Sequence, residues 1–234
     1  RKKHYLPIAI MAIFGNGIPA FLFTKAQTEL SSSVVGILNA LVPLFTLLLG
    51  VYFFKSRPSK TNIFGVLIAL LGAILLTFNT MEGGVEINNY IYLVILATIF
   101  YAISINIIKK YLYDLNASSI TSLAFLIIGP VAAVYLFSTD FINIINTNEK
   151  GYMALGYIAL LSVVGTSLAV IIFNNLINNS SAIFASSVTY LIPIVAILWG
   201  VFDGEQITEL HLLAVSVILS GVYLVNKKKS ALSL

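Results

Sequence analysis

The sequence has no cysteine and very little charge, and both absences narrow its class. Zero Cys excludes disulfide frameworks, thiolate metal sites and cysteine nucleophiles. Charged residues make up 9% of the 234 residues, against roughly 25% in soluble domains, while 59% are hydrophobic. Disorder would need low hydrophobicity and high net charge, whereas the mean hydropathy is +0.99. The net charge of +4 is too small and scattered to suggest a nucleic-acid partner. We therefore expect an integral membrane protein.

Eight apolar segments come close to the length that crosses a bilayer, which is roughly 20 residues for a helix. Their polarity does not alternate, so transmembrane strands are not expected. The segments are Tyr5 to Phe23, Val34 to Phe54, Asn62 to Phe78, Tyr90 to Ile108, Ile120 to Leu136, Tyr152 to Phe173, Ala182 to Phe202 and Leu210 to Val225. The predicted fold is an all-α integral membrane protein, a bundle of about eight transmembrane helices.

The loops between these spans divide by charge. One alternate set holds all but two of the 13 basic residues, and the other set holds all but one of the nine acidic residues. Lys and Arg in short loops resist translocation, so the basic loops are expected to be cytoplasmic. With eight spans, both termini then lie in the cytoplasm, and the expected location is the cell (inner) membrane. The basic set is Arg1, Lys2, Lys3, Lys55, Arg57, Lys60, Lys109, Lys110, Lys227, Lys228 and Lys229.

An internal repeat relates the two ends of the chain. An offset of 150 residues pairs Gly15 with Gly165, Phe23 with Phe173, Ser31 with Ser181, Leu41 with Leu191, Pro43 with Pro193 and Gly50 with Gly200. The second span thus matches the seventh, five spans later. An odd separation reverses the direction across the bilayer, so we predict two inverted repeats, an arrangement typical of secondary transporters with a midplane site.

The repeated motifs resemble a known family. They read Ser31-Ser32-Ser33, Leu41-Val42-Pro43, Gly50, Gly65 and Gly72 in the first unit, and Ser180-Ser181-Ala182, Leu191-Ile192-Pro193, Gly200, Gly204-Glu205 and Gly221 in the second. This pattern is similar to the EamA domain of the drug/metabolite transporter superfamily. The resemblance implies ten spans in two inverted five-helix units, and export or exchange of small metabolites, amino acids or drugs through a central cavity.

Two departures from the family pattern follow from this comparison. Residues 1–80 supply three spans of a partial first repeat, 81–89 an external linker, and 90–229 the five spans of the second repeat. Two helices of the first repeat are therefore expected to be missing, and the start at Arg1 rather than Met favours a fragment of a longer chain. Lys55 stands where the family's loop motif would place its acid, whereas Glu205 keeps it.

Two mid-span prolines, Pro43 and Pro193, are the predicted helix-bending residues. Each removes one helical hydrogen bond and displaces the carbonyl four residues earlier, at Asn39 and Thr189. Such freed groups must find partners or line a wet cavity. Inversion places both polar side chains at similar depth, which predicts a substrate-binding patch near the midplane. The alternative is that the prolines only bend the helices for packing.

Other polar residues extend this predicted cavity, which the first, second, fourth, sixth and seventh spans line. The repeat pairs Asn16 with Thr166, both beside glycines, although Asn16 suits interhelical packing equally well. Tyr101 also has an alternative role as a packed aromatic. Hydroxyl and amide donors suit an uncharged or zwitterionic solute. The full set of predicted substrate-binding residues is Asn16, Asn39, Tyr101, Asn106, Thr166, Thr189 and Tyr190.

Small residues share one face of the third span, at Gly65, Ala69 and Gly72, and of the eighth, at Ala214 and Gly221. This spacing is typical of close helix packing and predicts a scaffold role for both helices.

No ionisable residue lies well inside a span, which leaves proton coupling unsupported. No metal-ligand set, cofactor motif or catalytic constellation is recognised. We predict a transporter that exports or exchanges small metabolites by alternating access. The alternatives are a lipid or lipid-linked sugar flippase and a membrane-embedded enzyme. The expected partners are a small-molecule solute and the lipid bilayer, with no nucleic acid, and a homodimer stays an open alternative.

Overall fold

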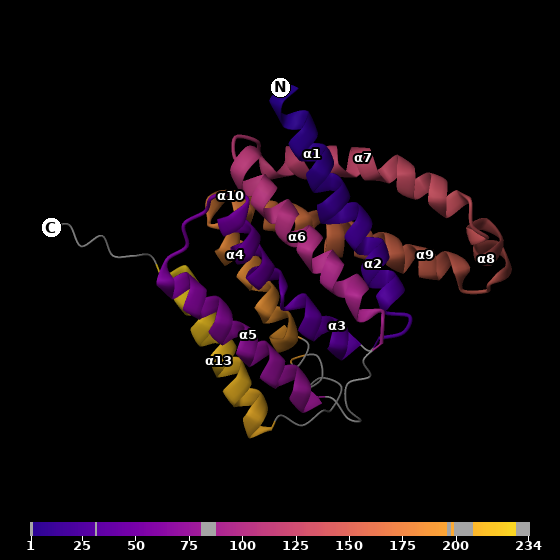
Figure 1. Cartoon of the computed structure of the whole chain (residues 1–234). Coiled ribbons are helices and arrows are strands. Elements are labelled where there is room, and N and C mark those ends of the chain that lie inside the picture. The colour runs from indigo at the N-terminus through magenta and orange to yellow at the C-terminus, as the bar shows by residue number, and fades with distance from the viewer. Residues whose placement is uncertain (1, 31, 81–87, 196–197, 199–207, 228–234) are drawn as a thin grey trace.

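A computed structural model describes residues 2–30, 32–80, 88–195, 198 and 208–227, and the regular elements of these residues are helical (Figure 1). Of the predicted linker at 81–89, only residues 88 and 89 are described. The motif residues Ser31, Gly200, Gly204 and Glu205 lie outside the described residues.

Each of the eight predicted spans is mainly helical in its described part. Residues 2–80 contain η1 (Lys2–His4), α1 (Tyr5–Ala12), η2 (Ile13–Gly17), α2 (Ile18–Ala26), α3 (Ser32–Asn39), α4 (Val42–Tyr52) and α5 (Lys60–Thr80). The remaining elements are α6 (Ile91–Tyr111), α7 (Ala117–Phe137), α8 (Phe141–Thr147), α9 (Gly151–Leu160), η3 (Leu161–Leu168), α10 (Ala169–Asn179), α11 (Ala182–Ser187), η4 (Val188–Leu191) and α13 (Glu209–Asn226).

Six of these helical runs are long and apolar enough to cross a membrane. They are Tyr5–Ala26, Val34–Tyr52, Ile91–Tyr111, Ala117–Phe137, Gly151–Asn179 and Glu209–Asn226. Two further apolar helices, Lys60–Leu76 and Ala182–Val195, are shorter. Helices form here because lipid offers the backbone no hydrogen-bond partner, so each span must satisfy its own N–H and C=O groups. The prediction of an all-α integral membrane bundle is confirmed.

Proline interrupts the second span. Between α3 and α4 the chain leaves helical geometry at Ala40 and Leu41, just before Pro43. The Leu41 N–H donates to the Leu38 carbonyl at 3.0 Å, a tighter pattern than an α-helix has. In the seventh span, α11 passes into the 3₁₀ segment η4 just before Pro193. Both interruptions lie where the ring of proline prevents an ordinary helical hydrogen bond.

The first and sixth spans each contain a widened, π-helical turn instead of a break. These turns are η2, which includes Gly15 and Asn16, and η3, which includes Gly165 and Thr166. Each π turn disrupts the regular hydrogen-bond ladder, and π-bulges frequently occur at functional sites.

The α6 helix lies at the centre of the bundle. It packs against α1, α2, α3, α4, α10 and α11. Its buried residues Ile105, Ile107 and Ile108 share a core with Met11 and Ile177. Gly15 brings η2 close to α6, because a Cβ at this position would collide with the Ser104 hydroxyl.

The α5 and α13 helices pack extensively on each other, side by side in Figure 1. A Cβ at Gly65 would lie 2.7 Å from the Gly221 carbonyl oxygen, and a Cβ at Gly72 would lie 2.8 Å from the Ile218 nitrogen. A Cβ at Gly221 would meet the backbone and Cβ of Ala69. The predicted packing face of small residues is therefore present on both helices.

The α7, α8 and α9 helices extend away from the bundle (Figure 1). The sixth span, Gly151–Asn179, is longer than the predicted Tyr152 to Phe173, and none of its most apolar 18-residue window is buried. The short α8, which lies in a connector, was not expected from the sequence because it is too short to show a span signal. Its position at the far end leaves the outer parts of α7 and α9 without the packing that α6 has.

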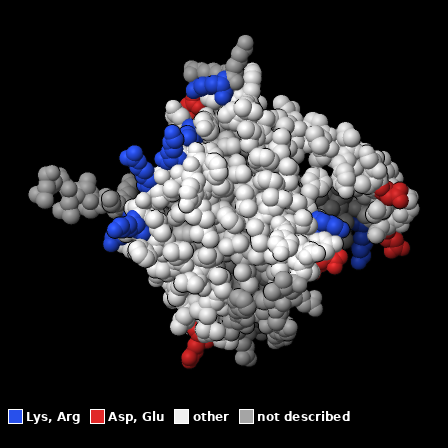
Figure 2. All heavy atoms as spheres, viewed as in Figure 1, with Lys and Arg blue, Asp and Glu red and all other residues white. Residues whose placement is uncertain are grey.

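Charges gather at opposite ends of the bundle. Figure 2 shows Lys and Arg mainly at the end where α1 and α5 begin, and Asp and Glu mainly at the end where α13 begins and α8 lies. At the basic end, Asp114 binds the N-terminal segment: Lys3 Nζ lies 2.7 Å from Asp114 Oδ2, and His4 Nε2 donates to Asp114 Oδ1 at 2.9 Å. His4 is buried in this contact. The Lys3 hydrogen bond, more than the charges of His4 and Lys3, lowers the pKa of Asp114 below its ordinary value.

Candidate functional site

The two proline interruptions meet on the α5 and α13 pair. Ala40, which follows Asn39, and Tyr190, which follows Thr189, are buried in one apolar cluster with Ala69 of α5. Tyr190 is fully buried, and its hydroxyl donates to the Val66 carbonyl at 3.1 Å. In this structure the hydroxyl hydrogen of Tyr190 is therefore used within the protein and does not donate to a solute.

Asn39 and Thr189 are both half-buried. The Thr189 hydroxyl donates to the Ser186 carbonyl at 2.9 Å, which satisfies one carbonyl in the last turn of α11. Of the two helix-bending prolines, Pro43 is buried and Pro193 is half-buried. The interruptions therefore place polar side chains inside the helical layer, next to carbonyls that proline has released.

Two further predicted residues lie on α6. The amide of Asn106 is buried and donates to the Thr46 carbonyl at 3.1 Å and to the Ala102 carbonyl at 2.9 Å, so it links α6 to α4. The Tyr101 ring is half-buried and stacks on Phe23 of α2, with 5.6 Å between ring centroids.

The last two predicted residues lie in the π turns. Asn16 is half-buried, and its amide donates to the Met11 sulfur at 3.7 Å. Thr166 is exposed on the sixth span. The structure thus brings residues beside Asn39 and Thr189 into one cluster, and places Asn106 and Tyr101 along α6. Thr166 lies on η3, the part of the sixth span in which no residue is buried.

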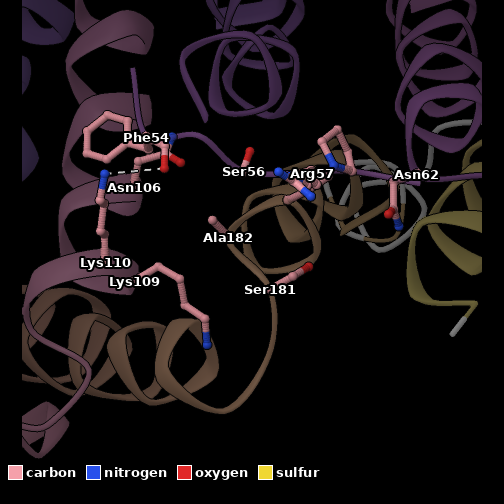
Figure 3. Close-up of a pocket in the computed structure, with 11 residues that line it drawn as sticks. Phe54, Ser56, Arg57, Asn62, Asn106, Lys109, Lys110, Ser181 and Ala182 are labelled. Carbon is pink, nitrogen blue, oxygen red and sulfur yellow. Dashed lines mark hydrogen bonds between the residues drawn. The ribbon is translucent and has the colours of Figure 1, made fainter. Parts of the chain in front are cut away.

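A pocket of about 360 Å³ opens at the basic end of the bundle (Figure 3). It lies between the loop after α4, the last turns of α6 and the start of α11. Asn106 is the predicted site residue that lines it. The other lining residues are Phe54, Ser56, Arg57, Pro58, Asn62, Lys109, Lys110, Ser181, Ala182 and Ile183.

The turn that leads from α4 into this pocket depends on Gly50. A Cβ at Gly50 would lie 2.8 Å from the Ser56 hydroxyl and 3.1 Å from Asn106 Oδ1. The Ser56 N–H donates to the Gly50 carbonyl at 2.9 Å, and Lys55 adopts a left-handed φ of 57° to make this turn. A glycine at position 50 therefore allows the loop to fold back against α6.

Both lysines of the pocket donate hydrogen bonds to backbone carbonyls. Lys109 Nζ donates to the Asn178 carbonyl at 2.9 Å, near the C-terminus of α10. Lys110 Nζ donates to the Phe54 carbonyl at 3.3 Å and lies 5.6 Å from the centre of the Phe54 ring. Cations are favourable at helix C-termini and over aromatic faces. In the sequence these residues indicated only orientation. The pocket forms because the loop after α4, the last turn of α6 and the start of α11, which are distant along the chain, come together.

No group of three or more His, Asp or Glu side chains that could hold a metal ion is found among the residues that the structure describes. The polar groups near mid-bundle are amides and hydroxyls. Such groups bind and orient a solute but supply no strong acid, base or nucleophile. The apolar helices around them are those of an integral membrane protein.

Comparison with known proteins gives the family. The profile of the EamA-like transporter family matches residues 1–78 and 88–227, and the chain belongs to this family. It is 25% identical over 221 residues to the "Uncharacterized transporter" of Archaeoglobus fulgidus, covering 94% of this chain and 76% of that protein. It is 28% identical over 231 residues to the "Uncharacterized inner membrane transporter YedA" of Escherichia coli K12, covering 94% and 69%.

The fold also has a solved counterpart. A crystal structure with 14% sequence identity superposes with a TM-score of 0.72, over 93% of this chain and 74% of the other. At that identity the likeness concerns the fold alone. The family and its relatives show that the chain is a multi-pass membrane transporter and not an enzyme.

Proposed function

We propose that this transporter exports or exchanges small metabolites, such as amino acids or drug-like solutes, by alternating access. The solute would bind near the midplane, among Asn16, Asn39, Tyr101, Asn106, Thr166, Thr189 and Tyr190. Two inverted repeats, a partial one at 1–80 and a second at 90–229, would rock about this site.

The observation that carries the proposal is that irregular backbone recurs at repeat-equivalent positions. An offset of 150 residues places the π turn at 13–17 on residues 163–167, inside η3. The same offset places the break at 40–41 on residues 190–191, inside η4. Non-helical backbone at membrane depth is tolerated where protein buries it or where it lines a cavity. Discontinuous helices in matching positions are typical of transporter sites at a repeat interface.

The packing of the repeats supports the same proposal. After a one-residue deletion the repeat pairs Gly72 with Gly221, which relates α5 of the first unit to α13 of the second, and these two helices pack on each other. Equivalent elements that meet in this way are expected about a pseudo-twofold axis in the membrane plane. The polar groups between the units are uncharged, which favours facilitated transport or exchange over proton coupling in this part of the protein.

Orientation follows from the basic end of the bundle. Because Lys and Arg in short loops stay on the cytoplasmic side, we infer that both termini and the pocket at Asn106 face the cytoplasm. The Escherichia coli relative is named an inner membrane transporter. We extend this location to the present chain.

Counterflow in proteoliposomes tests the proposal. The liposomes are loaded with an unlabelled mixture of the twenty amino acids, and uptake of each labelled amino acid is measured. Loss of a hydrogen bond to substrate costs about 1.5 to 3 kcal/mol when one partner is charged, so Asn39→Ala and Thr189→Ala are each expected to slow counterflow about tenfold or more.

The matched control is Thr24→Ala. The Thr24 hydroxyl also donates within its own helix, to the Ala20 carbonyl at 2.8 Å, but it is exposed on α2. Circular dichroism and reconstitution yield establish that each variant is folded and inserted. If Asn39→Ala and Thr189→Ala transport as fast as Thr24→Ala, the interrupted helices serve packing and the proposed site is wrong.

A further inference from the structure

The described residues that line the pocket at the basic end carry positive charge and include no carboxylate. Arg57, Lys109 and Lys110 contribute three cations, and the other lining residues are neutral. The Asp114 carboxylate, at the same end, is already held by Lys3 and His4.

These cations keep hydrogen-bond donors for a ligand. Each lysine has three N–H groups, and Lys109 uses one of them for the Asn178 carbonyl while Lys110 uses one for the Phe54 carbonyl. Arg57 is exposed at the rim, and Figure 3 shows its side chain across the pocket from both lysines. A guanidinium presents five donors in a fork that matches carboxylate and phosphate geometry. The pocket therefore offers cationic donors from two sides.

A hydroxyl group adds to this set. The Ser181 oxygen accepts from the Phe184 N–H at 3.0 Å, which caps α11 and leaves the hydroxyl hydrogen to donate. Retention of Lys and Arg in cytoplasmic loops explains their presence at this end of the bundle. It does not require that loops after the second, fourth and sixth spans converge on one concavity with Asn106 at its inner side.

We propose that this pocket binds the anionic group, a carboxylate or phosphate, of a solute that enters from the cytoplasm. The inference rests on the proposed function, because it names the chemical class of the transported solute. A volume of about 360 Å³ exceeds what a lone inorganic anion needs and falls within the usual range for small-molecule sites. Asn106 at the inner side places this anion site beside the predicted midplane residues, on the entry path.

Binding is tested on the full chain in nanodiscs of neutral phosphatidylcholine. Inorganic phosphate and succinate are titrated at constant ionic strength, and Tm is followed by circular dichroism, since a ligand that binds the folded state raises Tm. Arg57→Gln and Lys109→Gln are expected to raise the apparent Kd about tenfold. Lys60→Gln is the matched control because Lys60 is exposed at the same end and lies outside the pocket.

Three outcomes decide the inference. A tenfold change in Arg57→Gln with less than a twofold change in Lys60→Gln supports the pocket. An equal response in all variants overturns it, because phosphate then acts as a general stabilising salt. A lipid phosphate is the other source of such a group, so the titration is repeated with phosphatidylglycerol in the nanodisc. If phosphatidylglycerol abolishes the phosphate response of the unmodified chain, the assignment to a solute is overturned in favour of a lipid headgroup.

Counterflow separates this inference from the proposed function. If amino-acid counterflow occurs and Arg57→Gln changes neither Kd nor the KM for labelled glutamate, the pocket proposal fails while the transport proposal stands. If no labelled amino acid exchanges but Arg57→Gln still weakens phosphate binding, the transport proposal fails and the anion site stands without its role in entry.

Discussion

Replacing Gly221 with alanine tests how closely α5 and α13 approach. The new Cβ would lie 2.7 Å from the Ala69 Cβ and 2.7 Å from the Gly65 carbonyl oxygen, and would also meet the Ala69 backbone nitrogen. Ordinary contacts need roughly 3.5 to 4 Å. Backbone atoms cannot rotate away as a side chain would, so the two helices must separate by about 1 Å.

The expected cost follows from a matched substitution. Gly156 lies inside α9, and a Cβ there has no heavy atom within 4 Å. Alanine favours a helix over glycine by about 0.5 to 1 kcal/mol, and both variants gain this amount. Their difference isolates the steric term, for which overpacking costs about 1 to 3 kcal/mol. We expect Gly156→Ala to be neutral or slightly stabilised and Gly221→Ala to unfold more readily by that difference.

The assay is reversible unfolding in detergent, followed by far-UV circular dichroism. A difference of about 1.4 kcal/mol changes the ratio of folded to unfolded protein tenfold. Should Gly221→Ala prove as stable as Gly156→Ala, the backbones of α5 and α13 do not approach as described, and the scaffold role of this pair would have to be abandoned.

Two further substitutions probe individual contacts. Tyr190→Phe removes the hydrogen bond to the Val66 carbonyl and is expected to lower the free energy of unfolding by about 0.5 to 1.5 kcal/mol; Tyr223→Phe, at an exposed site on α13, should change it little, and equal effects would contradict a specific bond. Asp114→Asn should lower Tm at neutral pH by releasing Lys3 and His4. Because the pKa of Asp114 is lower in the folded chain, its contribution is present above the ordinary carboxyl pKa of about 4 and is lost as pH falls through the folded value. The Tm difference from the unmodified chain should therefore shrink below about pH 4, and a constant difference would exclude the ion pair as its cause.

The sequence was sufficient for the membrane class, the helical spans and the packing face of Gly65, Gly72 and Gly221, because each depends on local composition or spacing. It also identified the family through motifs around Pro43 and Pro193. The same prolines were predicted to bend their helices, and the helical geometry changes just before each of them, since the missing N–H acts within one turn of the residue.

Other features depend on contacts between distant segments. The sequence did not predict π turns at Asn16 and Thr166, because glycine-rich turns are equally compatible with ordinary helix. The pocket was missed because Arg57 comes from the loop after α4, Lys109 from the last turn of α6 and Ser181 from the residue before α11, and only tertiary packing brings them together. From the sequence, Arg57 and Lys109 were interpreted as loop charges and Ser181 as part of a family motif.

The tight contact of α5 with α13 also determines how the molecule can move under the proposed mechanism. In that mechanism one helix belongs to each repeat, and the backbones approach closely at Gly65 and Gly221, so sliding is sterically hindered and separation would lose packing contacts. This line then serves as a pivot axis. Displacement in a rotation grows with distance from its axis, so α8, at the far end of the molecule in Figure 1, is expected to travel farthest. The distance between spin labels on α5 and α13 should stay constant during transport, whereas the distance from α5 to a label on α8 should change most.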